Sequence, residues 1–145
     1  MTQEFSNIDT LRNYFERESK KYRDNNISTL KSSDLTELLS ISIDSSLIQI
    51  LSNPDIHKPY GRKVLYQDNL IEIMVATWTT QEMCIPHDHG GAWSAIRILQ
   101  GSATHNLYHI SNDSLLCVFT EVRQKRDTIQ CSPHQIHAMG SMGLA

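Results

Sequence analysis

The hydrophobic and polar positions divide the chain into a helical first third and a β-rich remainder. Apolar residues at three- and four-residue spacing over 8–15 predict a helix, preceded by a cap within Ser6-Asn7. A second helical stretch begins at Ser33-Asp34, and Asp44 caps a third. Asn53-Pro54 ends that third helix, because the residue before proline avoids helical geometry.

The rest of the chain consists of short β-branched and aromatic runs separated by turn formers such as Gly90-Gly91 and Gly101. Strands are expected near Arg62–Tyr66, Leu70–Trp78, Ile85–His89, Trp93–Gln100, Ala103–Ile110, Leu115–Arg123, Thr128–Cys131 and Ile136–Met139. Many short, closely spaced strands favour a sandwich or closed barrel over a sheet with crossover helices. We therefore predict a mainly β single domain, residues 1–145, with a helical part at 1–58 and a β part at 59–145.

Composition narrows the classes of function. The net charge is -3 and no basic cluster stands out, which argues against a nucleic-acid partner. No apolar run approaches the length of a membrane span and the N-terminus is polar, so we expect a cytoplasmic protein with no membrane partner. Three unevenly spaced cysteines without a Cys-x-x-Cys pair support neither a disulfide framework nor a zinc knuckle. No Gly-x-Gly-x-x-Gly unit indicates a nicotinamide or flavin enzyme.

The histidines are the unusual feature, because six of the seven fall in the last two-fifths of the chain. His87 and His89 are two residues apart, so on a strand both side chains project to the same face and reach one point. Two converging imidazoles bind a first-row transition metal well. His137 lies in a later predicted strand that a barrel can bring beside this pair. We therefore predict a mononuclear metal site built from His87, His89 and His137.

The other late histidines receive plainer interpretations. His134 is three residues from His137, so on a regular strand the two face oppositely, and it sits in the turn after Pro133. His105 and His109 are four apart, an even spacing that puts both on one face of the predicted strand, and they could mimic a second metal pair. Without a visible third partner, we expect both to be surface histidines.

The spacing from His87 to Gly101 matches the first cupin motif: His-x-His, four residues, a position usually occupied by glutamate, six residues, then glycine. Ser94, a poor metal ligand, stands at the glutamate position. Together with Tyr60–Arg62 and the string Cys84–Trp93, this pattern resembles the cysteine dioxygenase family of thiol dioxygenases, whose metal is held by three histidines. The resemblance covers Tyr60 to Met139 and implies a cupin-type double-stranded β-helix, a small jelly-roll barrel behind N-terminal helices.

The resemblance also implies a chemistry. Fe(II) would be the metal, cysteine and O2 the substrates, and cysteine sulfinic acid the product. Three neutral imidazoles leave Fe(II) its full charge, which favours a thiolate substrate. Arg62 would pair with the substrate carboxylate through two parallel hydrogen bonds, and Tyr60, on the same strand face, would add a hydroxyl. Relatives with glutamine at the Arg62 position prefer 3-mercaptopropionate, so Arg62 favours cysteine.

Two departures from the family pattern bear on activity. Animal enzymes carry at the Ser94 position a cysteine that is cross-linked to a tyrosine, so this chain forms no such cross-link and looks more like the bacterial branch. The family's Ser-x-His-x-Tyr segment does not follow His137, and we expect an exposed barrel edge. Two alternatives stay open: a 3-mercaptopropionate-type thiol dioxygenase, and a catalytically impaired cupin that binds a metal or ligand.

Overall fold

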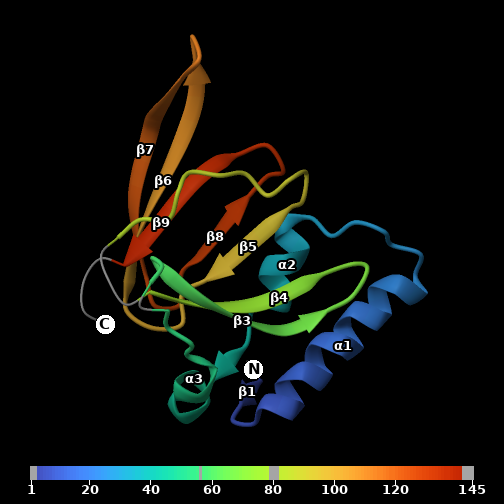
Figure 1. Ribbon diagram of the computed structural model, residues 1–145. Helices are drawn as coiled ribbons and strands as arrows, with labels where there is room; N and C mark the ends of the chain where they lie inside the picture. The colour runs from blue at the N-terminus through green and yellow to red at the C-terminus, as the bar shows by residue number, and fades with distance from the viewer. Residues whose placement is uncertain (1–2, 56, 79–81, 142–145) are drawn as a thin grey trace.

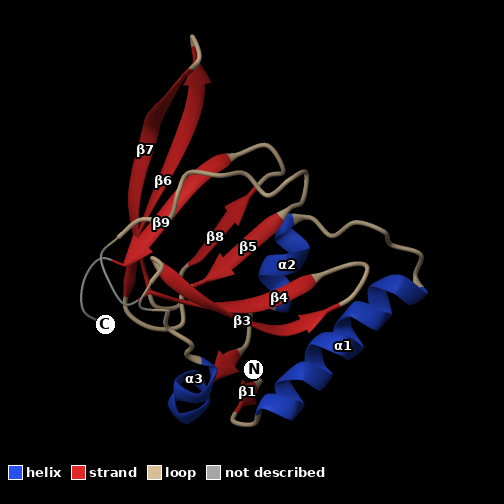
Figure 2. Cartoon of the chain, viewed as in Figure 1, coloured by secondary structure: helices blue, strands red, loops and turns tan. Residues whose placement is uncertain are grey.

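The computed structural model describes residues 3–55, 57–78 and 82–141, which form three helices and short strands (Figures 1 and 2). In chain order the elements are β1 (Glu4–Phe5), α1 (Ile8–Asp24), α2 (Ser32–Leu38), β2 (Ser42–Ile43), α3 (Ser45–Leu51), β3 (Tyr60–Gln67), β4 (Glu72–Trp78), β5 (Ser94–Arg97), β6 (Ser102–Ser111), β7 (Ser114–Gln124), β8 (Thr128–Cys131) and β9 (Ile136–Ser141). The predicted mainly β character and N-terminal helices are confirmed.

Caps define the helices where the sequence predicted them. The Asn7 side chain accepts hydrogen bonds from the backbone N–H groups of Asp9, at 2.8 Å, and Thr10, at 3.1 Å, and so begins α1. Asp44 accepts one from the Ser46 N–H at 3.1 Å and begins α3. None of the described helices combines the length and apolar character needed to cross a bilayer.

The described strands form four small sheets. β1 pairs with β2 in parallel, while β3–β4, β5–β8 and the three-stranded β7–β6–β9 sheet are antiparallel. The hairpin of β6 and β7 projects beyond the rest of the chain (Figure 1). It turns at Asn112 and Asp113, whose positive φ angles of 49° and 63° suit the tight turns that match strand twist. Within the described residues these sheets do not join into a closed barrel, so the cupin assignment stays a prediction.

An N-terminal core joins the helices to the β3–β4 sheet. We give this name to eleven buried apolar residues: Phe5, Leu11, Phe15, Leu30, Leu38, Ile41, Leu47, Leu51, Leu65, Ile71 and Ile73. One close approach at its border requires glycine, because a Cβ at Gly61 of β3 would lie 1.6 Å from the backbone oxygen of Asn53. The chain leaving α3 therefore runs directly against β3, which fixes the helical part on this sheet.

A smaller C-terminal core lies among the later strands. It consists of Cys84, Ile98, Ala103, Ile129, Cys131, Ala138 and Met139. Two histidines, His105 and His137, are buried as well. The β7 strand lies outside both cores and leaves large apolar side chains such as Val118 and Phe119 exposed. The histidines thus belong to the part of the molecule with the smaller apolar core.

Candidate metal centre

The backbone brings His87 beside His137. Each residue donates its N–H to the other's carbonyl oxygen at 2.9 Å. These two bonds make an isolated antiparallel bridge between His87 and the β9 residue His137. Farther along β9, glycine at position 140 lets the chain before His87 lie close to the strand, because a Cβ there would lie 2.7 Å from the Met83 sulfur and 3.0 Å from the backbone oxygen of Glu82. The predicted strand Ile85–His89 is wrong in extent, since only His87 forms a bridge before the turn at Gly90-Gly91. Both of these glycines have positive φ angles.

Three side chains then converge, as the sequence predicted. One ligand nitrogen each of His87, His89 and His137 lies within 4.8 Å of the other two. The ring centroids are 5.3 Å apart for His87–His89 and 4.8 Å apart for each of the other two pairs. We call these three residues the histidine cluster. His134, by contrast, is exposed in the turn before β9, so the preference for His137 over His134 agrees with their positions.

Each ring of the histidine cluster is held through its Nδ1 atom. His87 Nδ1 lies 2.8 Å from the carbonyl oxygen of Ile85, and His89 Nδ1 lies 3.2 Å from Ser94 Oγ. His137 Nδ1 lies 3.0 Å from the Nε2 atom of His105. Such outer partners orient metal-binding imidazoles and leave the second ring nitrogen for the ion.

The Nε2 atom of His137 shows that the cluster fits a metal. It is buried and has no hydrogen-bond partner among the described residues, although a buried polar atom without a partner is costly. An ion held by the cluster would satisfy this atom. Three imidazoles suit several first-row divalent metals, so the donor set alone does not select iron.

The electrostatics favour the neutral, ligating form of two cluster members, His89 and His137. Burial, with the neighbouring His89, His87 and His105, lowers the pKa of His137 to about 3. Burial and the proximity of His87 also lower the pKa of His89. A neutral imidazole offers a lone pair to a metal, whereas an imidazolium does not.

Ser94 occupies the position where the cupin motif usually has a carboxylate ligand. Its hydroxyl oxygen contacts the Nδ1 atom of His89, so Ser94 supports a cluster residue and is not one of the three ligands. Cys84 is buried in the C-terminal core, and its sulfur accepts a hydrogen bond from the Met139 N–H at 3.3 Å. Cys84 therefore contributes to the packing of this core.

The prediction that His105 is a surface residue is wrong. It is 2% exposed, and its Nδ1 lies 3.0 Å from Glu121 Oε1. On a strand it shares a face with the apolar residues Ala103 and Leu107, and this period-two pattern was a signal of burial that the sequence offered. His109, farther along β6, is exposed as predicted.

A second group could also hold a metal: the buried residues His105, Cys131 and His137. Burial raises the pKa of the Cys131 thiol, which disfavours the thiolate that binds metals. The facing nitrogens of the two histidines already share a hydrogen bond. The histidine cluster is therefore the better candidate.

The predicted substrate residues lie on β3. Tyr60 stacks on Trp78 with ring centroids 4.8 Å apart and packs against the C-terminal core, which contains the β9 residues Ala138 and Met139. Arg62 lies on an exposed part of the sheet, where its guanidinium contacts Glu72 at 3.2 Å and the Met74 sulfur at 3.1 Å. No described contact joins Arg62 to the histidine cluster.

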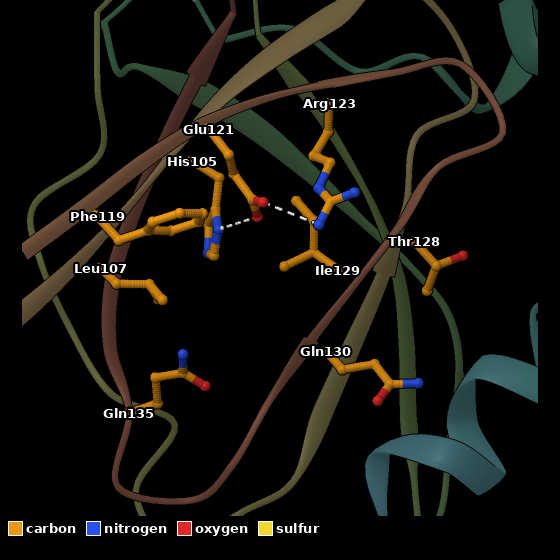
Figure 3. Close-up of a pocket in the computed structure, with 9 residues that line it drawn as sticks. All are labelled: His105, Leu107, Phe119, Glu121, Arg123, Thr128, Ile129, Gln130 and Gln135. Atoms are coloured by element: carbon orange, nitrogen blue, oxygen red, sulfur yellow. Dashed lines mark hydrogen bonds and ion pairs between the residues drawn. The ribbon is translucent and has the colours of Figure 1, made fainter.

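An open cavity of about 430 Å³ lies on the other side of His105, between β6, β7 and β8 (Figure 3). His105, Glu121 and Arg123 line it together with apolar and amide side chains. No member of the histidine cluster lines this cavity.

Comparison with protein-family models finds no match for this chain, and comparison with curated proteins finds none either. The functional argument therefore rests on the site and on the motif resemblance.

Proposed function

We propose that the chain is a metal-dependent thiol dioxygenase that converts cysteine and O2 to cysteine sulfinic acid, with Fe(II) held by His87, His89 and His137. The observation that carries the metal site is the convergence of three imidazoles, one of which has a buried Nε2 atom with no other partner. The spacing from His87 to Gly101 and its resemblance to the cysteine dioxygenase family support the choice of iron and of a thiol.

The reaction needs no external reductant. When bound, Fe(II) would supply an open position where the thiol and O2 meet. The sulfur loses four electrons and O2 gains them, so both oxygen atoms end on sulfur and the thiol proton ends on the sulfinic acid or in solvent. The cupin barrel that the resemblance implies belongs to this proposal.

The chain's own residues would bind and orient the substrate. Arg62 would exchange its contact with Glu72 for the cysteine carboxylate, and an exposed ion pair of this kind contributes only about 0–1 kcal/mol. Tyr60 would add a hydroxyl from the same strand, where stacking on Trp78 restricts its ring.

The test is anaerobic reconstitution with Fe(II), addition of cysteine and ¹⁸O2, and detection of sulfinate by mass spectrometry. We expect two labelled oxygens in the product of the wild type and no product from His87→Ala or His137→Ala. His134→Ala is the matched control, because its ring is exposed two residues before β9 begins. Absence of sulfinate in metal-loaded wild type would refute the proposal.

Substrate preference has a separate test. Arg62→Gln is expected to lower kcat/KM for cysteine relative to 3-mercaptopropionate by about tenfold or more, since the resemblance pairs arginine at this position with cysteine and glutamine with 3-mercaptopropionate. An unchanged ratio would show that Arg62 does not select between the two thiols.

The second candidate is a metal- or ligand-binding module without catalysis. The observation favouring it is the engagement of Arg62 with Glu72 and Met74 rather than with the neighbourhood of the histidine cluster. Metal bound in a ratio of one per chain without sulfinate would support this candidate.

A further inference from the structure

A chain of polar contacts extends from His137 into the β7–β6–β9 sheet, away from the histidine cluster. His137 Nδ1 lies 3.0 Å from His105 Nε2, and His105 Nδ1 lies 3.0 Å from Glu121 Oε1. The second carboxylate oxygen of Glu121 lies 2.8 Å from the Arg123 guanidinium. Figure 3 shows the Glu121 carboxylate between His105 and Arg123.

Strand register builds this arrangement. Glu121 of β7 is the direct cross-strand partner of His105 in β6. On the other side of β6, Leu107 is the partner of His137, so His105 and His137 are diagonal neighbours on one sheet face. Three adjacent strands therefore place the groups side by side, and the hydrogen bonds between them orient the two rings.

The hydrogen bonds require one consistent set of protons. The Glu121 carboxylate can only accept, so His105 carries its proton on Nδ1. A ring with its single proton on Nδ1 presents a lone pair on Nε2, and His137 then donates to it from Nδ1. The lone pair of His137 is thereby placed on Nε2, the buried atom with no other partner.

We propose that His105, anchored by Glu121 and Arg123, is a positioning residue that fixes His137 as the Nε2-ligating tautomer of the metal site. This inference rests on the metal site of the proposed function but not on its oxygen chemistry. The opposite tautomer would put an N–H toward the cluster in place of a lone pair and would leave His105 Nε2 facing a second acceptor.

The competing arrangement is a metal held by His105, Cys131 and His137. That ion would have to separate the His105–His137 nitrogens, which lie at hydrogen-bond distance, and compete with Glu121 for His105. The two arrangements make opposite demands on Cys131. A metal in the histidine cluster does not need its sulfur, whereas a metal in the second group does.

The experiment measures the tautomer directly. Long-range proton–nitrogen correlation spectra of ¹⁵N-labelled, metal-free protein distinguish an Nδ1–H ring from an Nε2–H ring. We expect His137 and His105 to be Nδ1–H in the wild type. In His105→Leu we expect His137 to shift toward Nε2–H and the affinity for Co(II) to fall about 10- to 100-fold, the usual effect of removing an outer-shell partner.

Matched variants separate positioning from packing. His105→Gln keeps an amide oxygen that can accept from His137 Nδ1 and is expected to restore the tautomer and most of the affinity. His109→Leu, on the same strand but exposed, is expected to change neither. If His105→Leu does not fold by circular dichroism, Glu121→Gln provides the test, with a mixed His105 tautomer and a severalfold lower affinity expected.

An Nε2–H tautomer of His137 in the wild type would overturn the inference, as would unchanged Co(II) affinity in His105→Leu. A large loss of affinity in Cys131→Ala would also overturn it, because it would place the metal in the second group. Wild type that binds Co(II) with the expected tautomers but forms no sulfinate would refute only the dioxygenase, so the two failures are distinguishable.

Discussion

The two cores of this protein differ in how completely the polar groups beside them are hydrogen-bonded. Beside the N-terminal core, Asp68 accepts hydrogen bonds from Tyr66 Oη at 2.6 Å, from Ser19, and from the N–H groups of Leu70 and Ile71. Beside the C-terminal core, His137 is more deeply buried than the half-buried Asp68, yet its Nε2 atom has no described partner. A fully satisfied group stabilises local structure, whereas an unsatisfied one indicates a site where a ligand completes the bonding. The candidate ligand site therefore lies beside the C-terminal core, and the satisfied carboxylate beside the N-terminal core.

The largest expected effect concerns the N-terminal core. Leu47 of α3 is 0% exposed, and Leu47→Ala should lower the free energy of unfolding by about 3–5 kcal/mol, as buried leucine truncations do. Ile50→Ala, on the same helix but 59% exposed, should change it by less than about 1 kcal/mol. Urea denaturation measures both values. Equal losses would contradict the packing that defines this core.

The second effect belongs to the histidine cluster. A metal that binds only the folded chain raises the free energy of unfolding by about 2.7 kcal/mol at a free concentration one hundred times Kd. Leu47→Ala should keep this increment, because Leu47 lies in the N-terminal core and not in the metal site. His137→Gln should lose it, because a metal ligand is removed. Thermal unfolding with Co(II) and with EDTA measures the increment. Its persistence in His137→Gln would place the metal elsewhere.

The third effect is the difference in stability lost when a half-buried carboxylate, that of Asp68, and an exposed one, that of Asp24, are each replaced by an amide. Burial would raise the pKa of Asp68, but hydrogen bonds from Ser19, Tyr66 and the backbone outweigh it and lower the pKa to about 2. Asp68→Asn should destabilise the protein by about 1–3 kcal/mol, since charge-assisted hydrogen bonds are weakened. Asp24→Asn, whose exposed carboxylate pairs with Lys20, should cost under about 1 kcal/mol. Denaturant midpoints at pH 7 compare them.

The smallest effect is the response to mild acid in metal-free protein. Unfolded histidine titrates near 6.5, whereas burial holds the pKa of folded His137 at about 3. Between these values the unfolded chain binds more protons, so stability present above pH 6.5 is lost as the pH falls. From pH 6.5 to 5.5 the loss due to His137 should be about 1 kcal/mol.

His137→Gln, which cannot titrate, should reduce this slope, whereas the contribution of Asp68 should disappear only as the pH falls from about 3.8 toward 2. Denaturation curves from pH 7 to pH 4 provide the measurement. Identical slopes in wild type and His137→Gln would show that the folded ring titrates as the unfolded one does.

Much of the fold followed from local pattern. The caps at Asn7 and Asp44 were readable because their side chains bond to residues two or three positions away. The strands from β6 to β9 were found because period-two alternation and turn residues are local signals. Which strands pair with one another could not be predicted in this way. Pairs such as β5–β8 join distant segments, and hydrogen bonds between strands leave no signature in a single sequence.

For the candidate site, the sequence alone determined the ligand types and their spacing: His87 and His89 two apart, and His137 on a later strand. Only the tertiary structure decided which nitrogen of each ring is available, because that depends on partners such as His105, 32 residues away from His137 in the chain. It also decided the role of His105 itself, which became a buried neighbour of Glu121 through the register of β6 and β7. The sequence specifies the identity of each side chain, but its protonation and burial depend on the residues that surround it in the folded structure.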